Sequence, residues 1–341
     1  MGVEGEFREP IEGDYIETMD GLLFSVKGLN HPRDLVIAYL RYIPDHDGDR
    51  MRGDRRYRRV YDLDETDELL LRCFPQYLNR IEEKALTLQS VPRGHIYRVY
   101  SPSERLRALM DKPGSELEEA IAVFVSTLSS ESGVPLSGFG VSGSVLIGLA
   151  GPASDIDVVV YGLDDGRKAY DALRRLRESS GWIRPYDSET VRGVVKSRWG
   201  DTGLDLEKFS HSEVSKLLHG LVGGRDYFIR LVMRRHEFEE ERTSRPLRRA
   251  VLRAEIVDAG HSIFTPCIYQ VRGCSYKNHA PGPAVTQLVS YRGKFTEQAR
   301  EGDKVEARGT VEEVMYEDRA VYRLMMGGKG DYLVTARSLD R

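Results

Sequence analysis

Apolar and polar residues alternate over short stretches in the first hundred residues, and this pattern predicts β-strands. In residues 15–28, Ile16 and the apolar run 22–26 flank the turn Met19-Asp20-Gly21, and an Asp-Gly turn between such runs predicts a hairpin. The other stretches that read as strands here are 36–43, 58–63 and 94–100.

Residues 116–129 carry the clearest helical pattern. Leu117, Ile121, Phe124 and Leu128 recur at steps of three and four and form one apolar stripe, so this helix should pack behind the strands that follow it. Further helices are predicted over 65–86, with a break or kink at Pro75, and over 102–110, 167–180 and 212–221. Residues 183–186, 191–199 and 203–209 read as strands.

The sequence pattern of the last third of the chain predicts a small β-barrel. Residues 234–249 alternate acidic and basic runs and predict a solvated helix or linker, with Pro246 as a boundary. Short strands follow over 302–315, 320–326 and 332–336, a spacing that suggests an OB-like barrel. The fold class is therefore α+β: an N-terminal α+β region (1–112), a core of mixed sheet with flanking helices (113–245) and a β-rich domain (246–341).

The stretch from residue 136 to residue 161 carries the clearest candidate chemistry. It reads as a strand over 136–141, a Gly-Ser turn at Gly143-Ser144, a helical turn, a loop of small residues and a second strand over 156–161. Asp155 and Asp157 stand two apart at the start of that strand, so their side chains share one face of the sheet. The sequence supplies no nearby Lys or Arg to relieve their repulsion.

A bound Mg²⁺ would relieve it, because hard cations take carboxylate oxygens and leave positions open for phosphate. The Gly-Ser turn ahead of a helical turn offers backbone N–H groups and a hydroxyl to a phosphate chain. The combination predicts phosphoryl or nucleotidyl transfer, in which catalysis is mostly positioning and charge neutralisation.

Gly143-Ser144, ten intervening residues and then Asp155-Ile156-Asp157-Val158 resemble the signature of the polymerase-β-like nucleotidyltransferase superfamily. The chain as a whole also resembles a group of archaeal predicted nucleotidyltransferases for which no substrate is settled. The stretches that carry this second resemblance are 27–32, 36–43, 226–232 and 263–267. The resemblance implies that residues 113–245 form a nucleotidyltransferase core that uses two Mg²⁺ ions and a nucleoside triphosphate (NTP). It also implies a third carboxylate on a later strand.

Asp205 is the preferred third carboxylate and metal ligand. It lies between Leu204 and Leu206, the pattern expected of an inward-facing acid on an otherwise buried strand, and Glu207 is the reserve candidate. In the family such a residue helps the attacking hydroxyl lose its proton.

Nucleotide binding is assigned to Gly143, Ser144 and Ser154, the last of which directly precedes the acidic pair. Lys208 and Arg230 are the preferred basic partners of the triphosphate, with Arg192 and Lys196 behind them, although all four equally fit surface charges.

Two other motifs compete with this interpretation. Gly138-x-Gly140-x-x-Gly143 matches a dinucleotide-binding fingerprint by letter, but the preceding residues 129–135 are polar and turn-like instead of forming the required apolar strand. The arginine-rich loop 44–57, with tyrosines nearby, fits phosphate contacts and base stacking along a polynucleotide. A solvated loop with internal ion pairs explains it better.

Composition narrows the class of protein. The 341 residues are 40% hydrophobic and 30% charged with a net charge of -4, which argues against a protein that coats nucleic acid. Three cysteines make no disulfide framework, and no apolar run approaches the ~18 residues that span a bilayer. We therefore expect a cytoplasmic enzyme with no membrane partner.

The predicted function is Mg²⁺-dependent transfer of a nucleoside monophosphate (NMP) from NTP to a hydroxyl of an RNA end, a protein or a small molecule. The alternative is a non-catalytic nucleotide- or RNA-binding module on the same fold. The acceptor and the oligomeric state stay open.

Overall fold

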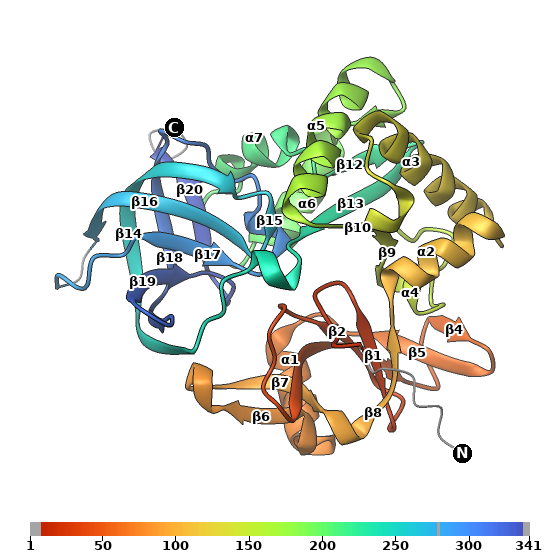
Figure 1. Cartoon of the computed structure of the whole chain (residues 1–341), viewed down its shortest axis with the longest axis horizontal. Helices are drawn as coiled ribbons and strands as arrows, with labels where there is room; N and C mark the ends of the chain where they lie inside the picture. Colours follow the sequence, from red (N-terminus) through yellow and green to blue (C-terminus); the bar gives the residue numbers. More distant parts are fainter. Residues whose placement is uncertain (1–7, 278–279, 337–341) are drawn as a thin grey trace.

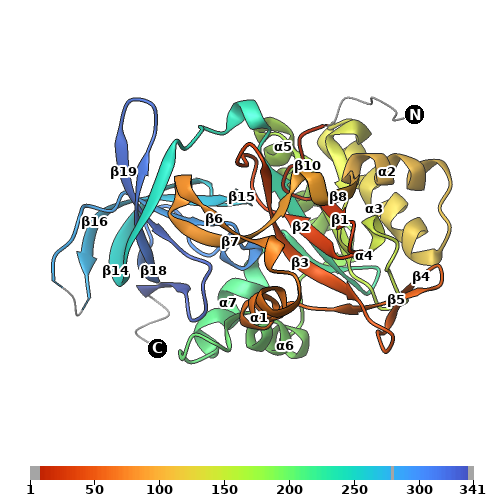
Figure 2. The ribbon, with the colours of Figure 1, turned by 90° about the horizontal axis from the view of Figure 1, so that it is seen from below.

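The computed structural model describes residues 8–277 and 280–336, and within them the strands form three sheets of eight, six and six strands. The N-terminal sheet and the core sheet lie against each other, and the C-terminal sheet lies to one side of them (Figures 1 and 2). The mixture of several sheets and separate helices confirms the predicted α+β class.

The N-terminal sheet contains the predicted hairpin, in which Ile16 pairs with Phe24. Its strands are β1 (Tyr15–Thr18), β2 (Leu23–Val26), β3 (Leu35–Pro44), β4 (Arg50–Arg52), β5 (Arg55–Arg59), β6 (Leu78–Ile81), β7 (Leu86–Pro92) and β8 (Ile96–Tyr100). The strand predicted over 58–63 is wrong in its second half, because Asp62 caps helix α1 (Leu63–Cys73) by accepting a hydrogen bond from the Glu65 backbone. The helix predicted over 65–86 is wrong beyond Cys73. It ends before Pro75, and the chain then turns into the β6–β7 hairpin.

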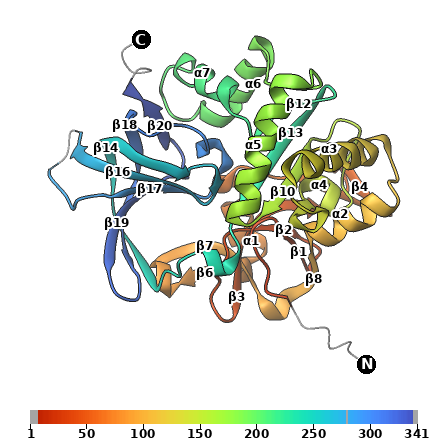
Figure 3. The same cartoon turned by 45° about the horizontal axis from the view of Figure 1, so that its top comes forward.

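The core sheet has the order β11-β12-β13-β10-β9, with β15 added beside β13. Strand β10 (Ile156–Tyr161) is parallel to β13 (Arg225–Val232) and antiparallel to β9 (Phe139–Val141). The remaining strands of the sheet are β11 (Ile183–Arg184), β12 (His219–Val222) and β15 (Phe264–Thr265). Helices α3 (Glu116–Ser132) and α5 (Leu163–Ser179) cover its outer face (Figure 3), and the apolar stripe predicted for α3 is buried there. Helix α2 (Pro102–Asp111) and the short α4 (Gly143–Leu146) flank β9.

The strands predicted over 191–199 and 203–209 are wrong. Residues Ser188–Trp199 form helix α6, in which Val191, Val195 and Trp199 are buried at steps of four, a helical spacing. A turn follows, and Glu207–Ser215 form helix α7, so the helix predicted over 212–221 is also wrong after Ser215. Trp199 stacks on Phe209, with ring centroids 4.4 Å apart, and this contact holds the two helices together.

The C-terminal sheet closes on itself. Its strands are β14 (Thr243–His261), β16 (Cys267–Tyr276), β17 (Gln287–Ser290), β18 (Lys304–Met315), β19 (Ala320–Met325) and β20 (Tyr332–Thr335). β14 pairs with β16 and with β18, so the pairings β14-β16-β17-β19-β18 form a ring. The solvated helix or linker predicted over 234–249 is wrong from Thr243 onward, because β14 begins there and runs through Pro246, which faces Glu312 at a register shift.

A buried ion pair lies where α7 meets the C-terminal domain. Lys216 donates from Nζ to Glu213 Oε1 at 2.8 Å and to the backbone oxygen of Lys294 at 2.6 Å, and both charged side chains are fully buried. Burial alone would raise the pKa of Glu213, but the charges of Lys216 and Arg198 lower it to about 2.

This lowered pKa predicts a pH-dependent stability. A carboxyl whose pKa falls from 4.5 to about 2 on folding stabilises the protein above pH 4.5, and that stabilisation disappears as the pH falls toward 2. We expect Glu213→Gln to lower the free energy of unfolding by about 3 kcal/mol at pH 7, because it leaves Lys216 buried without its partner. The difference from wild type should narrow toward pH 2, where Glu213 is protonated. Urea unfolding of both proteins across this range measures it, and a difference that stays constant would contradict the assignment.

None of the helices in the described residues is long and apolar enough to cross a membrane.

Candidate functional site

The turn between β9 and α4 lies directly against the acidic pair on β10. The Ser142 backbone N–H donates to the Asp157 backbone oxygen at 2.9 Å, which extends the β9–β10 pairing up to the turn. Gly143 follows with a φ of +60°, a conformation that glycine adopts without strain. A Cβ on Gly143 would lie 1.9 Å from Asp157 Oδ2, so glycine alone lets the turn approach the carboxylate this closely.

Asp155 and Asp157 form an acidic pair without a protein partner. Among the described residues, neither carboxylate accepts a hydrogen bond or makes an ion pair. Asp155 is exposed, whereas Asp157 is half-buried; burial and the charge of Asp155 together raise the pKa of Asp157 to about 6. The charges of Arg230 and Arg59 act in the opposite direction on the pKa of Asp157 but do not outweigh burial and Asp155. Two adjacent carboxylates without a hydrogen-bond partner fit a divalent cation.

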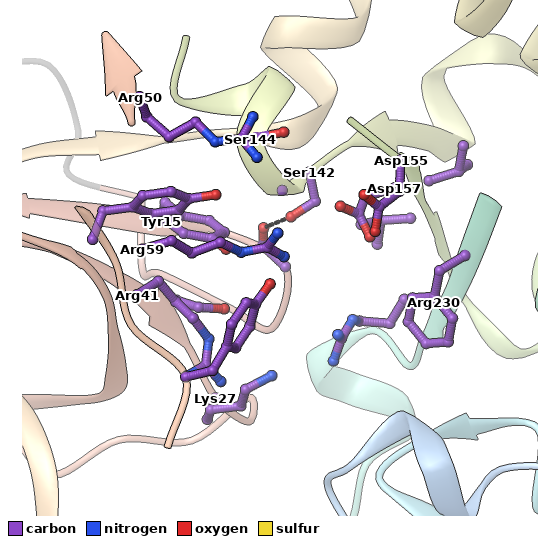
Figure 4. Close-up of a pocket in the computed structure, with 18 residues that line it drawn as sticks. Tyr15, Lys27, Arg41, Arg50, Arg59, Ser142, Ser144, Asp155, Asp157 and Arg230 are labelled. Atoms are coloured by element: carbon purple, nitrogen blue, oxygen red, sulfur yellow. Dashed lines mark hydrogen bonds between the residues drawn. The ribbon is translucent and has the colours of Figure 1, made fainter. Parts of the chain in front are cut away.

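The aspartates open into a cavity of about 160 Å³ between the core sheet and the N-terminal sheet. The core contributes Ser142, Gly143, Ser144, Asp155, Asp157, Val158, Val159, Phe228 and Arg230. The N-terminal region contributes Gly13, Tyr15, Ser25, Lys27, Arg41, Tyr42, Arg50, Arg59 and Tyr61. Figure 4 shows the aspartates and Arg230 facing Lys27, Arg41 and Arg59 across this space. Five basic side chains thus surround two acidic ones.

The carboxylate of Glu12 holds two of those basic side chains, Lys27 and Arg230, in place. This buried carboxylate accepts from Lys27 Nζ at 2.8 Å, from Arg230 Nη1 at 2.5 Å and from the Gly28 backbone at 2.8 Å. Because Lys27 comes from the N-terminal region and Arg230 from β13, this carboxylate joins the two halves of the site. Burial and the charge of Arg230 lower the pKa of Lys27 to about 8.

An apolar contact and one hydrogen bond hold the two halves together beside the cavity. Tyr15, Leu23, Tyr42 and Tyr57 of the N-terminal sheet pack with Leu146, Ile147 and Leu149 from the segment after the Gly-Ser turn. The Ser142 hydroxyl donates to the Gly13 backbone oxygen at 2.7 Å. The N-terminal sheet is therefore part of the site.

The structure brings together five of the residues predicted from the sequence: Gly143, Ser144, Asp155, Asp157 and Arg230 all line the cavity. Ser154 lies behind it, buried, and its hydroxyl accepts from the Gly151 backbone at 2.9 Å and from Arg50 Nη1 at 3.4 Å. Its observed role is to shape the loop before the acidic pair.

The predicted strand around Asp205 is wrong, and the residue lies outside the cavity lining. Asp205 is exposed in the turn before α7, where its carboxylate accepts from the Glu207 backbone at 3.1 Å. The hydrophobic-acid-hydrophobic pattern arises here because Leu204 and Leu206 pack on the C-terminal domain's core at the helix start. The other predicted charges on these helices are likewise absent from the cavity lining: Glu207, Lys208, Arg192 and Lys196.

Asp226 is the acid that the sequence interpretation missed. It lies on β13, two residues before Phe228, which pairs with Asp157, so period-two geometry puts Asp226 on the same face of the sheet as Asp157, although Asp226 is exposed and outside the cavity lining. Its carboxylate is hydrogen-bonded to Tyr186. The signal was present as Asp226-x-Phe228-x-Arg230 alternating with buried residues, but it depends on knowing that β13 lies beside β10.

No group of three His, Cys, Asp or Glu side chains arranged around one ion position occurs in the part of the chain that the structure describes. Asp155 and Asp157 therefore form the candidate metal site as a pair, with Asp226 on the neighbouring strand.

Comparison with known proteins gives one distant relative along nearly the whole chain. An uncharacterised protein of the archaeon Methanocaldococcus jannaschii is 26% identical over 328 residues, which is 92% of this chain and 94% of the relative. No protein-family model and no solved structure matches the chain.

Proposed function

We propose that the protein is a Mg²⁺-dependent nucleotidyltransferase that transfers an NMP unit from NTP to an acceptor hydroxyl and releases pyrophosphate. The observation that carries the proposal is the contact of Gly143 with Asp157: a glycine-only turn pressed against an unpartnered acidic pair in a cation-lined cavity. This arrangement places phosphate-binding groups and metal ligands within one small space, as transfer of a charged phosphoryl centre requires.

Each residue has a role in this proposal. Asp155 and Asp157 would hold the metal ions, which would supply charge neutralisation on the phosphates and activation of the acceptor hydroxyl. Gly143 and Ser144 hold the triphosphate, and Arg230, fixed by Glu12, neutralises it from the neighbouring strand. Asp226 takes the place first given to Asp205 as the third carboxylate, because it lies on the strand beside β10, on the sheet face that carries Asp157.

The second candidate is a nucleotide-binding module without turnover. The observation that favours it is the lack of three converging acidic side chains in the described residues, together with the hydrogen bond between Asp226 and Tyr186. In this case the protein binds NTP in the cavity but transfers nothing.

Under either candidate function, the C-terminal domain fits an OB-like barrel. The ring β14-β16-β17-β19-β18 and the parallel pairing of β17 with β19 support this interpretation. Fold likeness alone assigns it no ligand.

Incubation of the purified protein with each α-labelled NTP, Mg²⁺ and total cellular RNA or protein tests the proposal. We expect label in one acceptor fraction and pyrophosphate release, both abolished by EDTA. Nucleotide binding without label transfer or pyrophosphate release would favour the second candidate and overturn the first.

A further inference from the structure

Two basic side chains at the cavity, Arg41 on β3 and Arg59 on β5, have no acidic partner. Among the described residues neither makes an ion pair, and the one hydrogen bond of the Arg41 side chain goes to the backbone oxygen of Leu40 at 3.1 Å. The two guanidinium groups instead stack on Tyr61, 5.4 Å and 4.1 Å from its ring centroid. Asp155 and Asp157 face them across the cavity but lie beyond ion-pair distance.

This arrangement is electrostatically unfavourable for the protein alone. Burial and the nearby charge of Arg230 lower the pKa of Arg41, and Arg41 in turn adds to the lowering of the pKa of Lys27. The buried carboxylate of Glu12 is shared between Lys27 and Arg230, and Arg50 pairs with Asp49, which leaves Arg41 and Arg59 without an ion pair among the described residues. Repulsion of this kind is relieved by an anion that carries several charges in a small volume.

The arrangement of the basic side chains favours binding of a condensed phosphate over binding of a polynucleotide. The five cations converge on one cavity of about 160 Å³, whereas a single strand carries its phosphates along an extended track. Of the arginines of the β4–β5 region outside the cavity, Arg52 pairs with Glu17 and Arg58 pairs with Asp45 and Glu65, whereas Arg55 and Arg56 are exposed and make no ion pair among the described residues. The convergence of five cations on one small cavity therefore favours a compact anion.

We propose that the N-terminal sheet is a phosphate-binding half-site, in which Arg41 and Arg59, both stacked on Tyr61, hold a condensed phosphate chain without the help of a metal ion. This deepens the proposed function, on which it rests for taking the chain to be the triphosphate of the nucleotide or the pyrophosphate released. It gives the N-terminal sheet, which the sequence motif does not include, a direct part in substrate binding.

Calorimetric titration with inorganic tripolyphosphate in EDTA tests the half-site without catalysis or metal. We expect wild-type protein to bind it, and Arg41→Gln and Arg59→Gln each to weaken the binding about tenfold or more, since each removes charge-assisted hydrogen bonds. Arg98→Gln is the matched control: Arg98 stacks on Tyr100 at 4.7 Å in the same sheet but lies outside the cavity lining, and its loss should leave the affinity unchanged. Because Arg59 is exposed, its variant stays informative even if Arg41→Gln fails to fold.

Asp157→Asn separates this proposal from the proposed function. In EDTA it should bind tripolyphosphate as tightly as wild type or more tightly, because it removes a repelling charge, although it should lose transferase activity. Absence of tripolyphosphate binding in EDTA would overturn the half-site, as would equal affinities for wild type, Arg41→Gln and Arg59→Gln. Tight binding of a single-stranded oligonucleotide in place of tripolyphosphate would also overturn it. If the protein transfers no NMP but binds tripolyphosphate as expected, the half-site proposal stands and the enzyme proposal is overturned.

Discussion

Replacing Asp157 with alanine is expected to abolish NMP transfer, with a loss of at least about 10³-fold in rate. Asp157 is the recessed member of the acidic pair, in contact with the Gly-Ser turn, and its loss removes the proposed metal ligand that lies nearest this turn. A loss of this size corresponds to about 4 kcal/mol of transition-state stabilisation, a magnitude that metal-assisted charge neutralisation supplies. Labelled-NTP transfer at saturating Mg²⁺ measures it.

The same variant should remain folded. The pKa of Asp157 is raised on folding from 3.8 to about 6, so near pH 7 its ionised form is held less well in the folded state than in the unfolded state. Alanine removes this unfavourable term, and the melting temperature without metal should stay the same or rise. Unchanged turnover in Asp157→Ala would remove the enzyme proposal.

Substitution of two further aspartates distinguishes the third carboxylate chosen from the sequence, Asp205, from the one chosen from the structure, Asp226. Asp226→Ala should lower the transfer rate, because Asp226 lies on the strand beside β10, on the same face of the sheet as Asp157. Asp205→Ala should leave the rate near wild type, because Asp205 lies in the turn before α7 and not on the sheet that carries Asp157. The reverse result would restore Asp205 as the third carboxylate.

Gly143→Ala is expected to lower the transfer activity nearly as much as loss of the Asp157 carboxylate does. The added Cβ would overlap Asp157 Oδ2 at 1.9 Å and would also lie 2.8 Å from Asp157 Cγ, so the carboxylate or the turn must move. The φ of +60° adds backbone strain of about 1 kcal/mol for a residue with a side chain. We expect transfer activity to fall at least about 100-fold, since displacement of a catalytic group by about 1 Å has that effect.

Gly133→Ala is the control for the effect of backbone strain alone. Gly133 ends α3 with a φ of +72°, and a Cβ there meets no atom within 4 Å, so this variant has the strain without the overlap. Both variants should lose stability in thermal unfolding, but Gly133→Ala should keep its transfer activity. An active Gly143→Ala enzyme would show that the turn need not approach Asp157 for the reaction.

The elements that the sequence predicts well are those with one buried face and a strong local signal. The hairpin of β1 and β2 follows from Asp20-Gly21, β10 has the predicted bounds, and α3 follows from its apolar stripe. The prediction failed over residues 191–209. There Val191, Val195 and Trp199 are buried against the C-terminal domain, so the apolar positions reflect a neighbour that the local pattern does not reveal. The assignment of Asp205 failed with it.

The sequence by itself determined the acidic pair and the turn beside it. Strand periodicity places Asp155 and Asp157 on one face, and a glycine before a short helical turn is a local property of the backbone. Only the tertiary structure decided which other residues complete the site. Asp226 and Arg230 come from a strand that is parallel to β10 across a long connection, and Lys27, Arg41 and Arg59 come from a separate sheet. Pairing over such separations depends on how whole apolar faces pack together, so the local pattern that marks Asp226 and Arg230 as polar positions on a strand does not tell which strand lies beside them.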